Sequence, residues 1–275
     1  MSDCDLSQFY SNVLKRLLDR RVLSLDDRIL VVCGGPFDKE VLQSMGFRDV
    51  TITNLDERQK VDGGAEFAPY RWDFQDLESL SYADESYDVV LVHSGLHHLS
   101  CPQRGLNEMY RVARRAVIGF EPHRNLYTTL GVKLGAGQAY EDAAVYYNDC
   151  RWGGVANTEI PNYVVRFNRG DIERTVQIYN PIAHHKIDFF YATRIPCRLQ
   201  GLARQRLVGR AVSALTGVLA ALGRLPFLAN NLAFCIHKPR LPDDLFPWLM
   251  LKDGRVTCHR EWLEKKYRQP AAKGS

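Results

Sequence analysis

The sequence predicts an α/β protein built on a parallel, doubly wound sheet with crossover helices. Two observations predict this fold. Short apolar runs of strand length alternate along the chain with segments of helical periodicity. The first apolar run is continuous, which is typical of a strand buried on both faces, and it ends in a glycine-rich turn. Because a helix must carry the chain back between parallel strands, this alternation favours crossover connections.

The first half of the chain shows the alternation clearly. Residues 6–23 have the apolar spacing of an amphipathic helix. The elements expected next are a strand Arg28–Cys33, a helix Asp38–Met45 closed by Gly46, strands Val50–Thr53 and Tyr87–Val92, a helix Gln103–Arg115 and a strand Ala116–Phe120. The turn after the first strand is Gly34-Gly35-Pro36.

The second half departs from simple alternation. Residues 123–167 are rich in aromatics and amides, which suits a lid over an acceptor. Asn168 is expected to cap a helix that runs to about Tyr179, and the last two strands are expected at Ile187–Thr193 and Leu232–His237. We therefore divide the chain into an N-terminal helix (1–28), a main domain (29–240) with the lid (123–167) and a helical insertion (196–230), and a C-terminal tail (241–275) whose aromatics dock on the sheet.

Composition restricts the functional classes. The chain has 275 residues, with 36 Lys and Arg against 32 Asp and Glu, and a formal net charge of +4. This balance is too weak to indicate a nucleic-acid partner. Seven scattered cysteines without a CxxC pair indicate reduced thiols in a cytoplasmic protein and no metal site. The first residues lack a signal peptide's pattern, and no apolar run is long enough to span a bilayer.

Four motifs follow one another between residues 29 and 122. They are the turn Cys33–Asp38, the polar end Asn54-Leu55-Asp56 of the second strand, the segment from Gln75 into Tyr87-Asp88-Val89-Val90, and Ser94-Gly95-Leu96-His97-His98-Leu99. In this order the motifs resemble class I S-adenosylmethionine-dependent methyltransferases, particularly their small-molecule branch. The resemblance implies a seven-stranded Rossmann-like sheet and S-adenosylmethionine as cofactor. Two positions depart from the family pattern: Val31 stands where the first strand often has an acid, and Phe37 replaces a glycine of the loop.

The resemblance implies the following cofactor-binding residues. Gly34 and Gly35 are placed beside the methionine part, as are His93 and Ser94 at the end of the fourth strand. Asn54 stands at the position of the ribose-binding acid, and Asp56 shares or replaces that role. Asp76 matches the acid that binds the adenine amino group, with the Leu77 backbone beside it.

Methyl transfer to an alcohol or an activated carbon requires a base near the acceptor. In open sheets ligands lie at the carboxyl ends of the strands, where the sequence places four candidates. The candidate catalytic residues are His97, His98, Glu121 and His123, with His97 or His123 favoured as base and Glu121 as orienter or as base for a carbon acceptor. The lid offers Tyr146, Trp152, Asn162, Tyr163 and Arg166 as substrate-binding residues.

The leading hypothesis is a methyltransferase that modifies oxygen, or next carbon, of a small metabolite such as a natural product, a sugar or a lipid-like acceptor. Two rivals stay open: an NAD-type oxidoreductase on a similar sheet, which the broken GxGxxG pattern disfavours, and a non-catalytic cofactor-binding or interaction subunit. Residues 198–224 combine an apolar helical stripe with arginines, a pattern that suits an active-site cap, a homodimer contact, a phosphate-bearing substrate or a peripheral membrane contact.

Overall fold

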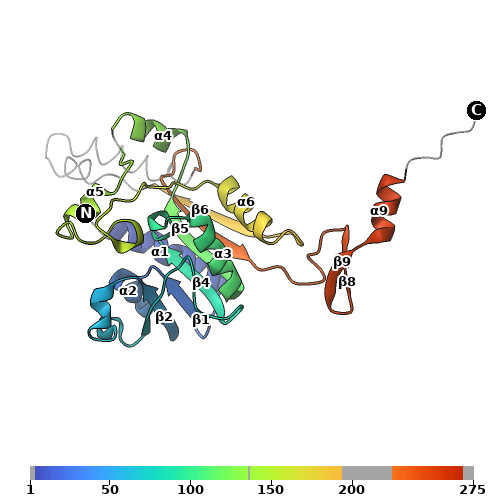
Figure 1. Ribbon diagram of the computed structural model, residues 1–275, viewed down its shortest axis with the longest axis horizontal. Coiled ribbons are helices and arrows are strands. Elements are labelled where there is room, and N and C mark those ends of the chain that lie inside the picture. The colour runs from blue at the N-terminus through green and yellow to red at the C-terminus, as the bar shows by residue number, and fades with distance from the viewer. Residues whose placement is uncertain (1–3, 136, 194–224, 269–275) are drawn as a thin grey trace, which may run out of the picture.

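The computed structural model describes residues 4–135, 137–193 and 225–268 and contains a seven-stranded sheet with helices on both faces (Figure 1). The strand order is β3-β2-β1-β4-β5-β7-β6. The strands are β1 (Arg28–Val32), β2 (Asp49–Asn54), β3 (Arg71–Phe74), β4 (Tyr87–His93), β5 (Ala113–Pro122), β6 (Ile187–Ala192) and β7 (Asn231–His237). Neighbours from β3 to β5 pair in parallel, whereas β7 runs antiparallel to both β5 and β6. The predicted doubly wound α/β sheet is confirmed, with one antiparallel strand.

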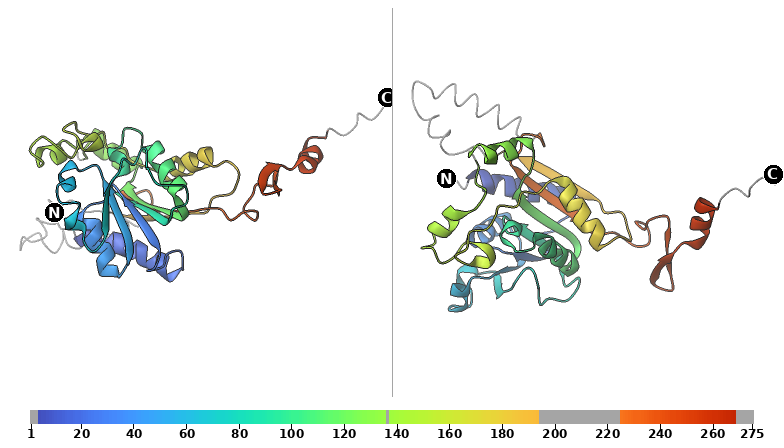
Figure 2. Two further views of the ribbon diagram at one scale, coloured as in Figure 1. Left: turned by 60° about the horizontal axis from the view of Figure 1, so that its bottom comes forward. Right: turned by 45° about the horizontal axis from the view of Figure 1, so that its top comes forward.

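Two hydrophobic clusters cover the two faces of the sheet. In β1, Ile29 and Val31 belong to one cluster, and Leu30 and Val32 belong to the other. The first cluster packs under α1 (Cys4–Asp19) and α2 (Pro36–Met45), and the second under α3 (Pro102–Val112) and α6 (Arg169–Tyr179). Figure 2 shows the α1 and α2 layer on one side of the sheet. Because successive side chains of a strand point to opposite faces, burial on both faces requires the continuous apolar run seen in the sequence.

Helix termini follow local chemistry. Gly46 closes α2 in the left-handed conformation, with φ of 86°, where glycine has no steric penalty. Asn168 caps α6 through a reciprocal pair with Asp171, as the sequence predicts. The first helix is shorter than expected, because the chain turns back after Asp19 and the Val22 N–H bonds to the Leu17 carbonyl at 2.9 Å.

The lid segment, residues 123–167, contains two short helices and a 3₁₀ turn. These are α4 (Leu126–Lys133), α5 (Asp142–Tyr146) and η4 (Val155–Asn157). The sequence predicts a helical insertion within residues 196–230. Positions 196–224 of that range lie outside the residues that the structure describes. Among the helices that the structure describes, none is long and apolar enough to cross a membrane.

The C-terminal tail forms a hairpin, β8 (Leu249–Lys252) with β9 (Arg255–Cys258), followed by α9 (Arg260–Tyr267). All three views show these elements beyond the end of the seven-stranded sheet (Figures 1 and 2). The tail meets the body through the loop before β6, where the Phe246 N–H bonds to the Ile182 carbonyl and the Phe246 ring lies 4.1 Å from that of His184. Phe246 in turn stacks on Trp248 at 4.5 Å. The prediction that these aromatics dock on the sheet is therefore wrong: they pack on this loop and on one another.

Candidate active site

The glycine turn after β1 brings the backbone close to the end of β2. The Gly34 N–H donates to the Thr53 carbonyl at 2.8 Å, and the Asn54 amide donates back to the Gly34 carbonyl at 2.8 Å. A Cβ on Gly34 would lie 2.7 Å from Ile52 and 2.8 Å from Val31, so a side chain does not fit there. At Gly35 a Cβ would meet nothing within 4 Å. The turn is thus packed tightly at its first glycine and open at its second.

The polar residues after β2 are held by protein partners. The Asn54 Oδ1 accepts hydrogen bonds from the Asp56 N–H at 3.1 Å and from the Trp72 indole at 3.2 Å. Asp56 forms a two-pronged ion pair with Arg58, which holds the pKa of the Asp56 carboxyl below its usual value despite partial burial. Asn54 therefore maintains the turn, and the carboxylate of Asp56 keeps a fixed orientation.

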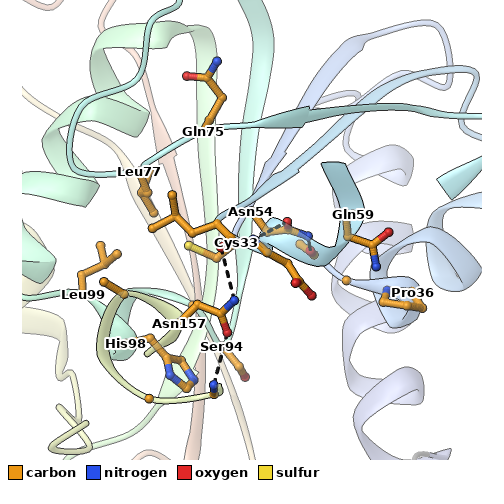
Figure 3. A pocket seen from close by; sticks show the side chains of 18 of the residues that line it. Cys33, Pro36, Asn54, Gln59, Gln75, Leu77, Ser94, His98, Leu99 and Asn157 are labelled. Atoms are coloured by element: carbon orange, nitrogen blue, oxygen red, sulfur yellow. Dashed lines mark hydrogen bonds between the residues drawn. The ribbon is translucent and has the colours of Figure 1, made fainter. Parts of the chain in front are cut away.

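A cavity of about 290 Å³ opens where β1, β2 and β4 end (Figure 3). This is the point at which the strand order reverses, where doubly wound sheets place ligands. Six of the eight predicted cofactor residues line the cavity: Gly34, Gly35, Asn54, Asp56, Leu77 and Ser94. Residues that the sequence analysis did not propose complete the wall, among them Gln59, Phe67, Gln75, Leu99 and Asn157.

The other two predicted cofactor residues, His93 and Asp76, do not line the cavity. His93 is stacked on the Tyr10 ring at 4.8 Å and lies 5.1 Å from that of Phe37, and burial lowers its pKa. Asp76 is exposed next to the lining residues Gln75 and Leu77, and its Oδ1 accepts a hydrogen bond from the Glu78 N–H at 2.8 Å.

His97 lies between two carboxylates. Its Nδ1 is 2.6 Å from Glu121 Oε2, and its Nε2 is 3.5 Å from Glu141 Oε2. The other oxygen of Glu121 accepts the N–H groups of Gly95 and Leu96 at 3.0 and 2.8 Å. Burial by itself would lower the pKa of His97, but the charges of Glu121 and Glu141 outweigh it and raise the pKa to about 10. A histidine with a raised pKa is a poor base as long as no metal ion takes the place of its proton.

The lid supplies the second carboxylate of this cluster. Glu141 Oε2 lies 3.2 Å from the His98 Nε2, and the Asn162 amide donates both to Glu141 and to the His97 carbonyl. Burial would raise the pKa of Glu141, but His97 and His98 lower it to about 2. Burial and the nearby charge of His97 lower the pKa of His98. Of the four predicted catalytic residues, His98 is the one that lines the cavity.

The remaining predicted residues lie away from the cavity wall. His123 is buried, with its Nδ1 3.1 Å from the Ala229 carbonyl oxygen. Tyr146 and Tyr163 are mainly exposed, and the guanidinium of Arg166 donates to the carbonyls of Val164 and Gln138. The ring of Trp152 lies under the Arg58 guanidinium at 5.5 Å. Asn162 contacts the histidine cluster and not the cavity.

Of the lid residues at the site, Glu141 was not expected from the sequence, and Asn157 was expected only as one of the lid amides. Glu141 reaches His98 across 43 positions of the chain, and the Asn157 amide reaches the Leu55 carbonyl across 102 positions. Asn157 also accepts the Gly153 N–H at 3.2 Å, which holds the glycine pair 153–154 at the cavity wall (Figure 3). That glycine pair, followed within four residues by an amide, is the signal that could have indicated this part of the wall.

Comparison with known proteins finds a similarity within the first half of the chain. A family model described as a methyltransferase domain matches residues 31–118. Ubiquinone/menaquinone biosynthesis C-methyltransferase UbiE of Roseobacter denitrificans is 33% identical over 95 residues, which are 32% of this chain and 38% of that protein. The match therefore spans well under half the length of this curated relative.

Solved structures share the fold at low sequence identity. Magnesium protoporphyrin IX methyltransferase from Synechocystis PCC 6803, solved with bound S-adenosylhomocysteine, has a TM-score of 0.51 at 13% identity, over 85% of this chain and 83% of that one. The methyltransferase solved with the Haloferax volcanii Trm112 activator has a TM-score of 0.53 at 11% identity, over 86% and 94%. A methyltransferase from Archaeoglobus fulgidus has a TM-score of 0.50 at 12% identity, over 84% and 94%.

Proposed function

We propose that this chain is a class I S-adenosylmethionine-dependent methyltransferase, on the similarity of residues 31–118 to a methyltransferase domain, and that it transfers a methyl group from S-adenosylmethionine to a small-molecule acceptor. The observation that carries this proposal is the cavity at the ends of β1, β2 and β4, lined by the glycine turn, Asp56, Leu77 and Ser94. When bound, S-adenosylmethionine supplies an electrophilic methyl group on a sulfonium.

The cavity wall fits the parts of such a cofactor. The open space at Gly35 admits a ligand close to the backbone at the start of α2. Asp56, fixed by Arg58, retains lone pairs that can accept ribose hydroxyl groups. Phe67, Leu77 and Leu99 provide apolar surface suited to a flat base, and Asp76 stands next to Leu77.

Acceptor activation is assigned to the His98 end of the cavity, where His98 lies beside His97 and Glu141. His98 lines the cavity wall, and Figure 3 shows His98 and Asn157 at one end of the cavity with Gln75 at the other. His97 and Glu121 are hydrogen-bonded to each other, and the His123 ring is hydrogen-bonded to the Ala229 backbone carbonyl. These three side chains are therefore positioned to orient neighbouring groups. Proton removal from an acceptor is therefore expected at the His98 end.

A lipid-like acceptor is favoured by the surface of α4. Leu126 of this helix is 84% exposed, Leu134 directly after its last residue is 74% exposed, and Tyr127 and Leu130 are about half exposed. A row of exposed apolar side chains on one short helix of the lid suits contact with an apolar substrate or a membrane surface.

Flotation with vesicles of anionic phospholipid should recover the chain with the lipid, and the double variant Leu126→Ser, Leu134→Ser should reduce that recovery. Unchanged recovery in the double variant would remove α4 from the contact.

Calorimetry with S-adenosylhomocysteine tests the cofactor assignment. Binding is expected for the full chain, and Asp56→Ala should weaken it by about 10- to 100-fold, the value of one hydrogen bond to a charged group. Asp26→Asn, which changes an exposed carboxylate paired with Arg48, is the matched control and should bind normally. Binding of NAD in place of S-adenosylhomocysteine would overturn the proposal.

A further inference from the structure

The cluster of His97, His98 and Glu141 has the composition of a metal site. The imidazole nitrogens and one carboxylate oxygen of these residues lie within 4.8 Å of one another. His97 is buried, whereas His98 and Glu141 are partly exposed, so the cluster opens on one side. That side is the cavity, since His98 lines its wall.

The spacing of the ligand atoms fits a small divalent cation. Glu141 Oε2 is 3.5 Å from His97 Nε2 and 3.2 Å from His98 Nε2. Tetrahedral zinc binds nitrogen and oxygen at about 2.0–2.1 Å, which separates neighbouring ligand atoms by about 3.3–3.4 Å. Both distances are close to this separation, and the ligand atoms of all three residues lie within 4.8 Å of one another.

The groups around the cluster are of the kind that orient histidine ligands in metal sites. Glu121 Oε2 lies 2.6 Å from His97 Nδ1, which orients the ring and leaves Nε2 toward Glu141. Histidine ligands of metals generally have such a carboxylate behind them. Glu121 and Glu141 together place two carboxylates around His97, a charge that suits a divalent cation.

Asn162 provides a second, independent observation. It is 1% exposed, and its amide nitrogen contacts both Glu141 and the His97 carbonyl, which fixes the orientation of the amide. Its Oδ1 is buried without a hydrogen-bond partner in the described part of the chain. An unpaired buried acceptor is costly, and a water or hydroxide held by a cation at the cluster would supply a donor.

We propose that His97 Nε2, His98 Nε2 and Glu141 Oε2 form a zinc site whose fourth position opens to the cavity. Three protein ligands with one open position are typical of catalytic zinc, which lowers the pKa of an oxygen ligand. Binding of zinc stands on the geometry alone. Its use, to hold an acceptor oxygen near the transferred methyl group, rests on the proposed methyltransferase function.

Metal titration tests the site directly. The full chain is freed of metal by dialysis against a chelator and titrated with Zn²⁺ or Co²⁺. One ion per chain is expected, and Co²⁺ should give the intense visible absorption of tetrahedral coordination. Glu141→Gln and His98→Gln alter partly exposed side chains. Each should weaken metal binding by at least about 100-fold, because replacing residues that only orient the ligands already lowers metal affinity by about 10- to 100-fold.

The matched control is His237→Gln, which removes a histidine from an ordinary histidine–carboxylate pair with Asp188 at 2.9 Å. This variant should bind the metal as the unaltered chain does. No stoichiometric binding, binding that survives both Glu141→Gln and His98→Gln, or the weak spectrum of octahedral cobalt would each overturn the zinc site. Calorimetry with S-adenosylhomocysteine on the same metal-free protein separates the proposals: retained binding leaves the methyltransferase function in place, whatever the metal result.

Discussion

Glu121 shows how one buried side chain organises the site. Its carboxylate is inaccessible to solvent and serves three donors: the N–H groups of Gly95 and Leu96 and the ring of His97. The position of Glu121 at the end of a predicted strand suits an orienter or a base for a carbon acceptor. The structure places it behind His97, where it holds the turn after β4 and the histidine together.

Replacing Glu121 with alanine should therefore destabilise the protein. The change leaves two buried N–H groups and His97 without their acceptor, and loss of one partner of a buried pair costs about 3–5 kcal/mol. Urea denaturation followed by circular dichroism measures the free energy of unfolding. Glu40→Ala, at an exposed position of α2, is the control and should change it by less than about 0.5 kcal/mol. A loss in Glu121→Ala no larger than in the control would show that its three contacts do not hold the site.

At the scale of elements, the strands with the most apolar sequences were the most predictable. Residues 29–32 of β1 and residues 89–92 of β4 are buried on both faces, so these stretches are continuous apolar runs. β3 was missed because Arg71–Phe74 is short, only partly buried and at the sheet edge, where no apolar pattern is required. The antiparallel direction of β7 was also missed, since an apolar run has the same pattern in either direction.

The two glycines of the turn after β1 were predicted together but have different surroundings. Gly34→Ala should destabilise the fold by about 1–3 kcal/mol, because its Cβ would lie within 2.8 Å of both Ile52 and Val31. Gly35→Ala should leave stability nearly unchanged, because the added methyl meets nothing within 4 Å. Since that open space adjoins the cavity, Gly35→Ala should instead weaken binding of S-adenosylhomocysteine.

Thermal unfolding and calorimetry on both variants separate the two effects. Each variant serves as the control for the other, because the same methyl group is added at neighbouring positions. A stable Gly34→Ala protein, or a Gly35→Ala protein with unaltered binding, would contradict the division of the turn into a packed and an open residue.

At the scale of the whole molecule, the site is made by two distant parts of the chain. The β1, β2 and β4 ends supply the cofactor side of the cavity, and these were recognisable because their motifs are local. Residues 123–167 contribute Asn157 to the cavity wall and complete the histidine cluster through Glu141 and Asn162. These contacts join residues more than 40 positions apart, so a local pattern could indicate the segment with the glycine pair and Asn157 but not the residues that it meets.

The C-terminal hairpin and α9 are expected to be dispensable for the cofactor site. They lie beyond the end of the sheet, and Trp248 and Trp262 pack within the tail, with ring centroids 6.1 Å apart. A chain ending at Pro247 keeps the bond between the Phe246 N–H and the Ile182 carbonyl. Its affinity for S-adenosylhomocysteine should be unchanged within about twofold, which is about 0.4 kcal/mol, by calorimetry.

A second truncation, ending at Leu241, provides the comparison. It removes Asp244, whose carbonyl accepts the His184 N–H at 2.9 Å, and Phe246, whose ring covers His184. This shorter chain should unfold at a lower temperature than the chain ending at Pro247, because the loop before β6 loses its partner. Weaker cofactor binding in the longer truncated chain would instead mean that the tail contributes to the cavity, and the site would then extend beyond the sheet and the lid.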